Sequence, residues 1–187
     1  CTMTGYVLAK YKFKLNKFFY TLALVIMLFP TYGSLPASYK LIHGLHLANS
    51  PLILLTFISG FGFNFFILYG YFKNLSNEYM EAGFIDGASH FQVFLHIMVP
   101  QAKPILVSLA VMFAIGQWND YNTAYLYMDQ HPTIALGIFR FQNLMVYQIN
   151  YPLLFAIIVM SVIPVIIVYA LAQEKIMTNM SIGGLKG

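Results

Sequence analysis

The chain has 187 residues, of which 59% are hydrophobic and only 9% are charged. Soluble domains carry about 25% charged residues, so this chain lacks the polar surface of a soluble fold and belongs to the membrane class. The net charge of +4 comes without a stripe of Lys and Arg interleaved with aromatic residues, which argues against nucleic-acid binding. A single cysteine, Cys1, excludes an intramolecular disulfide and a cysteine-based metal cluster.

Four stretches are apolar enough and long enough to cross a bilayer as helices, which takes about 20 residues. They are residues 18–36, 51–72, 104–128 and 151–172. Residues 1–9 have the composition of the tail of an earlier span. Because the chain begins with Cys rather than Met, we expect a fragment without its amino-terminal part. The fold class expected is all-α, a polytopic membrane helical bundle with four complete transmembrane helices and the end of a fifth, forming one domain over residues 1–187.

The basic residues predict which side of the membrane each loop faces. Eight of the ten Lys and Arg residues fall in the loop after residue 9, at the ends of the polar segment 73–103, or in the carboxyl-terminal tail. Lys40 and Arg140 fall in the two remaining loops. Cytoplasmic loops are enriched in Lys and Arg, so this distribution predicts that the polar segment and the carboxyl terminus are cytoplasmic.

A polar residue, Asn64, lies in the middle of the second predicted span. Thr56, Gly60 and Asn64 recur at four-residue spacing, which places them on one face of a helix. One interpretation is that this face lines a solute path. The other is close packing of helices by small residues, with Asn64 hydrogen-bonded to a neighbouring helix.

The polar segment 73–103 holds three of the six acidic residues. We expect Ser76 or Asn77 to cap a helix whose first turn carries Glu78 and Glu81, because carboxylates there complement the helix dipole. The small residues that follow, Ala82 and Gly83, would permit the close approach of a partner surface.

The helix is expected to end at Asp86-Gly87, since glycine accepts backbone angles that other residues resist. Ser89 is expected to cap a second helix. An apolar stripe should face the membrane bundle, and it consists of Phe91, Phe94, Leu95 and Met98. Pro100 and Pro104 are expected to mark a turn into the next span.

A polar cluster, Trp118, Asn119 and Asp120, lies near the outer end of the third predicted span. Acids within membranes are costly and usually face protein or water. The cluster suits a sugar, whose hydroxyls pair with amides and carboxylates and whose ring faces stack on indole. A structural cluster at the helix end, or a contact with a second subunit, are the alternatives.

The polar segment resembles a known signature. Glu81-Ala82-Gly83, then Gly87, then nine residues to Ile97-Met98-Val99-Pro100, is similar to the EAA loop of the permeases of ATP-binding-cassette (ABC) importers. Gly83 stands where that loop has its second Ala, and Val99 where it has Leu. The resemblance implies a cytoplasmic coupling helix that docks a partner ATPase. The docking residues it implies are Glu78, Glu81, Ala82, Gly83, Asp86, Gly87, Ala88 and Pro100.

Three further stretches resemble the carbohydrate, maltose-permease-like branch of that family. They read YVLAK at residues 6–10, GQWNDY at residues 116–121 and MSIGGLKG at residues 180–187. Members of the family have about six spans, so this chain would lack the first and most of the second. The resemblance also implies that the tail 180–187 reaches the ATPase interface.

The chain has no phosphate-binding loop and no zinc-protease or serine-hydrolase signature, so it is not expected to be an enzyme. His43 and His46 lack an evident third ligand, and no metal site is expected. We therefore expect a multi-pass permease of the bacterial cell membrane that imports a sugar or oligosaccharide. Its expected partners are a second permease, an extracellular solute-binding protein, membrane lipid, and two ATPases that bind ATP and magnesium in place of any cofactor in this chain. A permease for another solute and a gradient-driven transporter are the alternatives.

Overall fold

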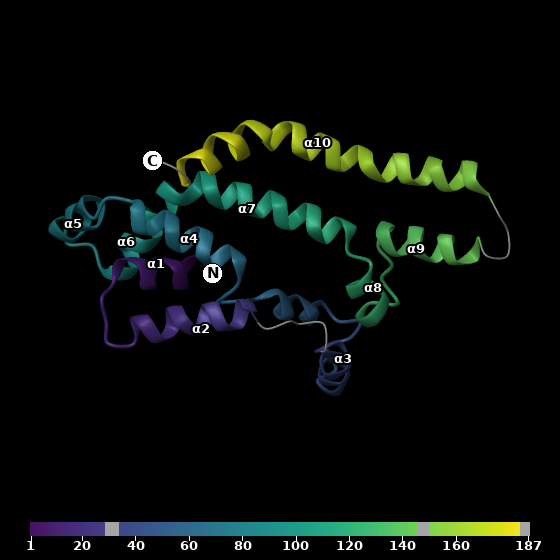
Figure 1. The fold of residues 1–187 in the computed structure, drawn as a ribbon, viewed down its shortest axis with the longest axis horizontal. Coiled ribbons are helices and arrows are strands. Elements are labelled where there is room, and N and C mark those ends of the chain that lie inside the picture. The colour runs from purple at the N-terminus through teal and green to yellow at the C-terminus, as the bar shows by residue number, and fades with distance from the viewer. Residues whose placement is uncertain (29–33, 146–149, 184–187) are drawn as a thin grey trace. The chain divides into compact units, whose positions relative to one another are not determined.

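The structure is a computed structural model that describes the backbone of residues 1–28, 34–145 and 150–183, with side chains as far as Gln173. Every regular element in these ranges is a helix, which confirms the predicted all-α class. The α-helices (Figure 1) are α1 (Thr2–Lys10), α2 (Asn16–Leu28), α3 (Leu35–Gly44), α4 (Phe63–Asn74), α5 (Glu78–Ile85), α6 (His90–Val93), α7 (Val99–Asn119), α8 (Asn122–Tyr127), α9 (Ile134–Leu144) and α10 (Tyr151–Gly183). A 3-10 helix, η2 (Pro51–Phe57), and a π-helical turn, η3 (Phe94–Met98), complete them.

The chain divides into two units. The first holds α1, α2, α4, α5, α6, η3 and the start of α7, and the second holds α3, η2, the rest of α7, α8, α9 and most of α10. The prediction of one domain over residues 1–187 concerns the whole chain and stays a prediction.

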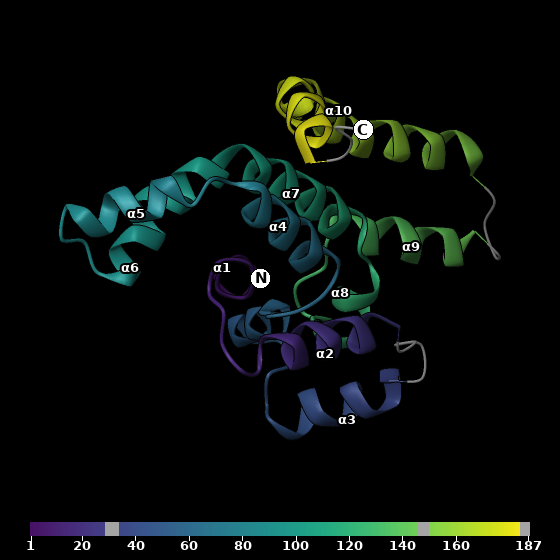
Figure 2. The same ribbon diagram turned by 60° about the vertical axis from the view of Figure 1, so that its left-hand side comes forward.

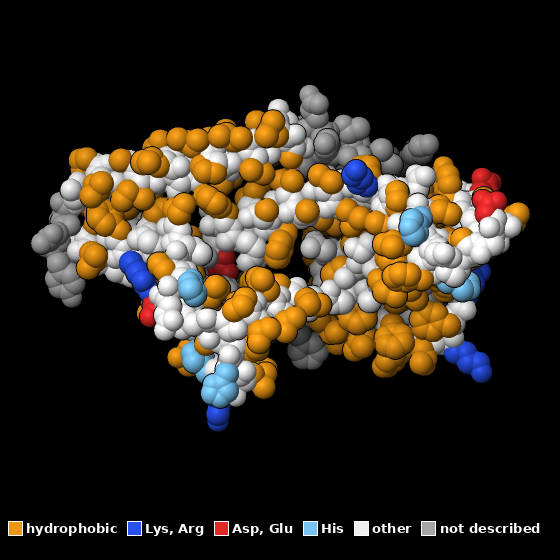
Figure 3. Space-filling view, turned by 180° about the vertical axis from the view of Figure 1, so that it is seen from behind, with side chains coloured by type: hydrophobic (Ala, Val, Ile, Leu, Met, Phe, Trp, Pro, Cys, Tyr) orange, Lys and Arg blue, Asp and Glu red, His pale blue; other side chains and the backbone are white. Residues whose placement is uncertain are grey.

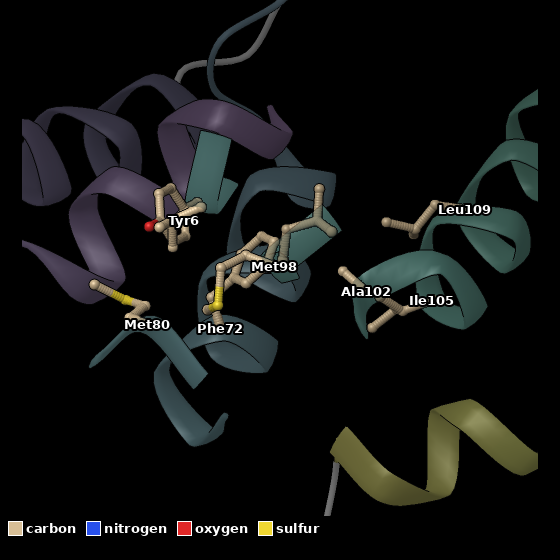
Figure 4. Close-up of a cluster of buried hydrophobic side chains, with 9 residues drawn as sticks. Tyr6, Phe72, Met80, Met98, Ala102, Ile105 and Leu109 are labelled. Atoms are coloured by element: carbon tan, nitrogen blue, oxygen red, sulfur yellow. The ribbon is translucent and has the colours of Figure 1, made fainter. Parts of the chain in front are cut away.

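The core of the first unit joins α1, α4, α5, α6, η3 and α7. Phe72 and Met98 are fully buried, and Tyr6 packs edge-on against Phe72 with the ring centroids 5.5 Å apart (Figure 4). Burying a side chain the size of Phe72 contributes about 1.5–3 kcal/mol relative to water. The buried cluster consists of Tyr6, Leu68, Phe72, Met80, Val93, Met98, Ala102, Ile105 and Leu109.

The second predicted span is not one continuous helix. η2 ends at Phe57, residues 58–62 are irregular, and α4 begins at Phe63. Gly62 has a φ of 137°, which side chains with a Cβ rarely adopt, and the carbonyl of Gly60 accepts the hydroxyl of Thr4 at 2.6 Å. The prediction of one helix over 51–72 is therefore wrong, because the glycines at 60 and 62 let the chain leave helical geometry.

The predicted turn at Pro100 and Pro104 is also wrong. The chain runs as one helix from His90 to Asn119, with η3 inside it. A proline ring clashes with the carbonyl four residues earlier, which for Pro100 is that of His96. The wider π turn covers this position, and the N–H of Val99 donates to the carbonyl of Phe94. The helix therefore bypasses the clash without breaking.

The remaining predicted spans differ in outcome. The fourth, 151–172, lies within α10 and is confirmed as a helix. The third, 104–128, is wrong as a single helix, because α7 ends at Asn119 and α8 begins at Asn122. The first, 18–36, is helical in α2 as far as Leu28, and its next residues, 29–33, lie outside the described ranges.

Two helices in the described ranges are long and apolar enough to cross a membrane, 90–119 and 151–173. α10 exposes large apolar side chains, among them Phe155, Met160 and Leu171. On the face drawn in Figure 3, hydrophobic side chains dominate and charged ones are sparse. These surfaces suit lipid rather than water. The number of membrane crossings stays a prediction.

Candidate functional site

Most of the predicted docking residues lie in a helical hairpin, residues 76–98, which consists of α5, a turn, α6 and η3 (Figure 2). α5 begins at Glu78, directly after Asn77, which is one of the two predicted cap residues, and it carries Glu78 and Glu81 in its first turn. The hydroxyl of Ser76 accepts the N–H of Glu78 at 3.2 Å. The negative side chains face the positive end of the helix dipole, which stabilises this terminus.

The turn of the hairpin is built from two helix ends. Gly87 has a φ of 81°, and the N–H of Ala88 donates to the carbonyl of Gly83 at 3.0 Å, the pattern of a Schellman motif. Ser89 then forms a capping box with Gln92, since each side chain accepts the backbone N–H of the other. Both predicted boundaries, Asp86-Gly87 and Ser89, are confirmed, and local hydrogen bonds fix the hairpin's shape.

The inner face of α5 packs on the second arm. Gly83 is buried, and a Cβ placed on it would lie 2.5 Å from Cδ1 of Ile97 and 3.1 Å from Cγ2 of Val93. Met80, on the same face, is also buried. The small size of Gly83 therefore serves contact between the two arms of the hairpin, and not the approach of a partner as expected from the sequence.

The outer face of α5 is exposed. Glu78, Glu81, Ala82 and Ile85 follow one another at helical spacing, and all four are exposed. Ile85 is 85% exposed, which is unusual for so apolar a side chain next to two carboxylates. Within the described side chains, no basic group forms an ion pair with Glu78, Glu81 or Asp86. This face is therefore acidic with one apolar projection.

The other predicted docking residues lie near the turn and in the following helix. Asp86 and Gly87 are exposed and Ala88 is half-buried. Together with Gln92 and His96, these three residues line a shallow open hollow. Pro100 is exposed in the first turn of α7.

The predicted apolar stripe is only half right. Met98 is buried and Phe94 packs against the core, but Phe91 and Leu95 are 60% and 46% exposed. Val93 takes the buried place instead. The π turn is the physical reason, because its extra residue rotates the side chains relative to the α-helical register.

Two residues outside the predicted docking set, Lys10 and Tyr11, contact this hairpin. The Lys10 ammonium donates to Oδ1 of Asn77 at 2.8 Å, and the hydroxyl of Tyr11 hydrogen-bonds Nδ1 of His90 at 2.9 Å. Their partners lie 67 and 79 residues away in sequence, so no local pattern could reveal them.

The first group of predicted solute-path residues, Gly60 and Asn64, belongs to the first unit. Gly60 lies in the irregular segment and Asn64 is half-buried in the first turn of α4. The prediction that Thr56, Gly60 and Asn64 share one helix face is wrong, because the helix is interrupted between them.

The second group, Trp118, Asn119 and Asp120, lies in the second unit. Nε1 of Trp118 donates to the carbonyl of Ser161 at 3.1 Å, and Nδ2 of Asn119 donates to that of Ile115 at 2.9 Å. Asp120 accepts the N–H groups of Asn122 and Thr123 at 2.9 and 3.2 Å. The Asp120 carboxylate therefore satisfies the first turn of α8.

Among the described residues, no group of three or more His, Cys, Asp and Glu side chains is placed to hold a metal ion. The tail predicted to reach a partner, residues 180–187, lies outside the described side chains.

Residues 2–179 match the family model described as the inner membrane component of binding-protein-dependent transport systems. The chain belongs to this family. It is therefore a membrane protein and a component of a transport system, as the signature in the hairpin predicted. The comparison covers nearly the whole chain and not the hairpin alone.

Several similar proteins are named as permeases for carbohydrates. The chain is 31% identical to the diacetylchitobiose uptake system permease protein of Streptomyces coelicolor, over 97% of this chain and 61% of that protein. It is 30% identical to the arabinooligosaccharides transport system permease protein of Halalkalibacterium halodurans, over 100% of this chain and 67% of that one. The chain thus spans about three fifths to two thirds of the length of these relatives.

A solved structure has the same fold. It is the crystal structure of a bacterial ABC transporter involved in the import of the acidic polysaccharide alginate. The TM-score is 0.73 with 26% sequence identity, over 91% of this chain and 65% of that chain.

Proposed function

We propose that the protein is the permease subunit of an ABC importer that moves a sugar or oligosaccharide across the bacterial cell membrane. The solute would be delivered by an extracellular solute-binding protein, and ATP hydrolysis in two partner ATPases would drive transport. A second, homologous permease would complete the path. Membership in a binding-protein-dependent family and the carbohydrate names of the relatives support this proposal.

The observation that carries the proposal is the exposed, acidic outer face of α5. The carboxylates of Glu78 and Glu81 on this face, and that of Asp86 at its end, form no ion pair within the described side chains. They suit a partner with a basic rim, because complementary charge guides association and fixes orientation. Ile85 suits an apolar pocket at the centre of that partner surface, as buried anchors dominate interfaces. The partner we assign to this face is the cytoplasmic ATPase.

The hairpin also explains how this subunit would receive energy. The sequence has no phosphate-binding loop, so ATP and magnesium would be held by the partner subunits. Closure of the ATPases on ATP would push α5. The push would reach α4 and α7 through Met80 and Met98, which are buried in the core of the first unit. Because packed cores resist deformation, the spans would move as rigid bodies and alternate the access of the path.

For the solute path, Trp118 is the strongest of the predicted residues. Its N–H is bound to the protein, but the indole is 38% exposed and can stack on a sugar ring. Asn119 is exposed beside it, while Asp120 is engaged at the start of α8. Gly60 and Asn64 remain proposed path residues of the first unit. The orientation that the basic residues predict would place the carboxyl terminus in the cytoplasm.

The test is assembly of the full-length permease with its ATPase in membranes, followed by co-purification and by measurement of solute-stimulated ATP hydrolysis. Glu81→Lys reverses a charge on the proposed docking face and should weaken co-purification about tenfold or more, since mispaired interface charges cost several kcal/mol. Asp129→Lys is the matched control. It changes the charge by the same amount on an exposed residue outside the hairpin, whose ion pair with Arg140 is worth about 0–1 kcal/mol.

Equal co-purification of both variants would refute the docking face. The solute class has a separate test in the same vesicles, with the binding protein present. Oligosaccharides should stimulate ATP hydrolysis, and amino acids or metal ions should not. Stimulation by a solute that is not a carbohydrate would refute the sugar while leaving the importer in place.

A further inference from the structure

The end of α1 contacts both arms of the hairpin. The Lys10 ammonium donates to the backbone carbonyl of Leu75, where α4 ends, and to Oδ1 of Asn77, the residue before α5. A cation at this position also compensates the carbonyls at the carboxyl end of α4. One side chain therefore ties three helices together at the entry of the hairpin.

Tyr11 makes the second contact, at the exit of the turn. Its hydroxyl hydrogen-bonds Nδ1 of His90, the first residue of α6, at 2.9 Å. The rings of Tyr11 and His90 meet edge to face with their centroids 5.5 Å apart. The ring of Phe84, in α5, also packs edge to face against His90, with the centroids 4.8 Å apart. The hydroxyl of Tyr6 lies 3.3 Å from that of Tyr11 and extends this contact into α1.

The two residues are held in place from the other side. Asn16, the first residue of α2, donates through Nδ2 to the carbonyls of Leu8 and Tyr11 at 2.9 and 2.7 Å. These bonds fix the direction in which the chain leaves α1. Burial lowers the pKa of the Lys10 amine, because desolvation penalises its charged form. Such a cost is tolerated where oxygen atoms receive the charge.

We propose that Lys10 and Tyr11 are positioning residues that fasten the hairpin to α1, so that α1 moves with it during transport. This inference rests on the proposed function. It adds a mechanical connection between the docking face and α1, a helix that lies outside the EAA-like signature of residues 81–100. Neither residue belongs to the outer face of α5 or to the proposed solute path. Their loss should leave docking intact and lower the transport obtained from each ATP.

The test uses the complete importer in vesicles and compares single substitutions. Lys10→Met removes the donor and keeps the stem, Lys10→Arg keeps a cationic donor, and Tyr11→Phe removes only the hydroxyl. Lys12→Met and Lys14→Met are matched controls, because both lysines are exposed in the same loop. The readouts are ATPase co-purification, basal ATP hydrolysis and solute moved per ATP.

We expect Lys10→Met to lower solute moved per ATP by about tenfold, with co-purification and basal hydrolysis unchanged. Lys10→Arg should recover most of the loss, and the two controls should behave as wild type. If Lys10→Met and Tyr11→Phe both transport as the controls do, the inference is wrong. Loss of ATPase binding in Lys10→Met would also overturn it, since the residue would then serve docking.

A covalent bridge gives a second readout that does not depend on the stability of Lys10→Met. In a protein with Cys1→Ser, Lys10→Cys and Asn77→Cys, a short bifunctional thiol reagent would join α1 to the hairpin. Transport per ATP should be low before the reaction and recover after it. Arrest by the bridge would mean that the hairpin moves independently of α1. Glu81→Lys, run in parallel, separates the two ideas, because undiminished docking in that variant refutes the proposed docking face rather than the fastening.

Discussion

The close contact between Gly83 and Ile97 makes a quantitative prediction. Gly83→Ala adds a Cβ that would lie 2.5 Å from Cδ1 of Ile97, well inside normal contact. Overpacking of this kind costs about 1–3 kcal/mol, whereas replacing a helical glycine by alanine gains about 0.8–1.0 kcal/mol. We therefore expect Gly83→Ala to destabilise the hairpin by about 0–2 kcal/mol.

Ile97→Val removes the atom that the new Cβ would meet. Alone, this change should cost about 0.5–1.5 kcal/mol, the usual effect of deleting one methyl from a packed site. In the double variant the clash with Ile97 is gone, only the milder contact with Cγ2 of Val93 at 3.1 Å is left, and the helix gain of alanine remains. The pair should then be close to wild type, with a favourable coupling energy of about 1–2 kcal/mol.

Hydrogen exchange is the suitable assay, because it reports the local opening free energy of the hairpin amides within the membrane protein. The amides of α5, followed by mass spectrometry in the wild type and the three variants, complete a double-mutant cycle. Additive effects, with coupling below about 0.3 kcal/mol, would refute the close packing of α5 on η3.

Three further outcomes are expected. Gly87→Ala should destabilise the hairpin turn by about 1–2 kcal/mol, because its φ of 81° is unfavourable for a residue with a Cβ; faster exchange of the turn amides would show it, and Gly87→Asn should cost less. Ser89→Ala should cost about 1 kcal/mol through loss of the capping box, with faster exchange confined to α6; unchanged exchange would contradict the cap. Asp120→Asn keeps an oxygen that can accept the N–H of Asn122, so it should leave the KM for solute in the transport assay unchanged, whereas a several-fold rise in KM would show that the carboxylate binds solute.

The hairpin was predictable because its signals are local. Serine caps, first-turn carboxylates and the glycine at 87 each act within a few residues, and the structure has helix boundaries at those positions. The packing of the second arm was not predictable in the same way. The stripe assumed α-helical periodicity, and the π turn before Pro100 changed which side chains are buried.

For the predicted spans, the position along the chain was predictable but the continuity of each helix was not. Hydropathy located the apolar stretches but carried little information on continuity, since apolar composition does not distinguish a helix from an interrupted one. Gly60 and Gly62 are a visible sign of the break before α4, but the prediction of one helix over 51–72 gave more weight to the high hydropathy of the stretch. The contacts of Lys10 and Tyr11 had no sequence sign, because they join residues far apart in the chain.

The two faces of α5 predict two separable defects. The side chains of the outer face, Glu78, Glu81 and Ile85, are exposed, so changes there should affect docking, with only a small loss of helix-dipole stabilisation when a carboxylate is removed. The inner face, with Met80 and Gly83, packs within the first unit and has no exposed surface for a partner. A change there that preserves the fold should spare docking and impair transport per ATP. A combined outer and inner variant should show both losses independently, because the two sets of contacts share no atoms.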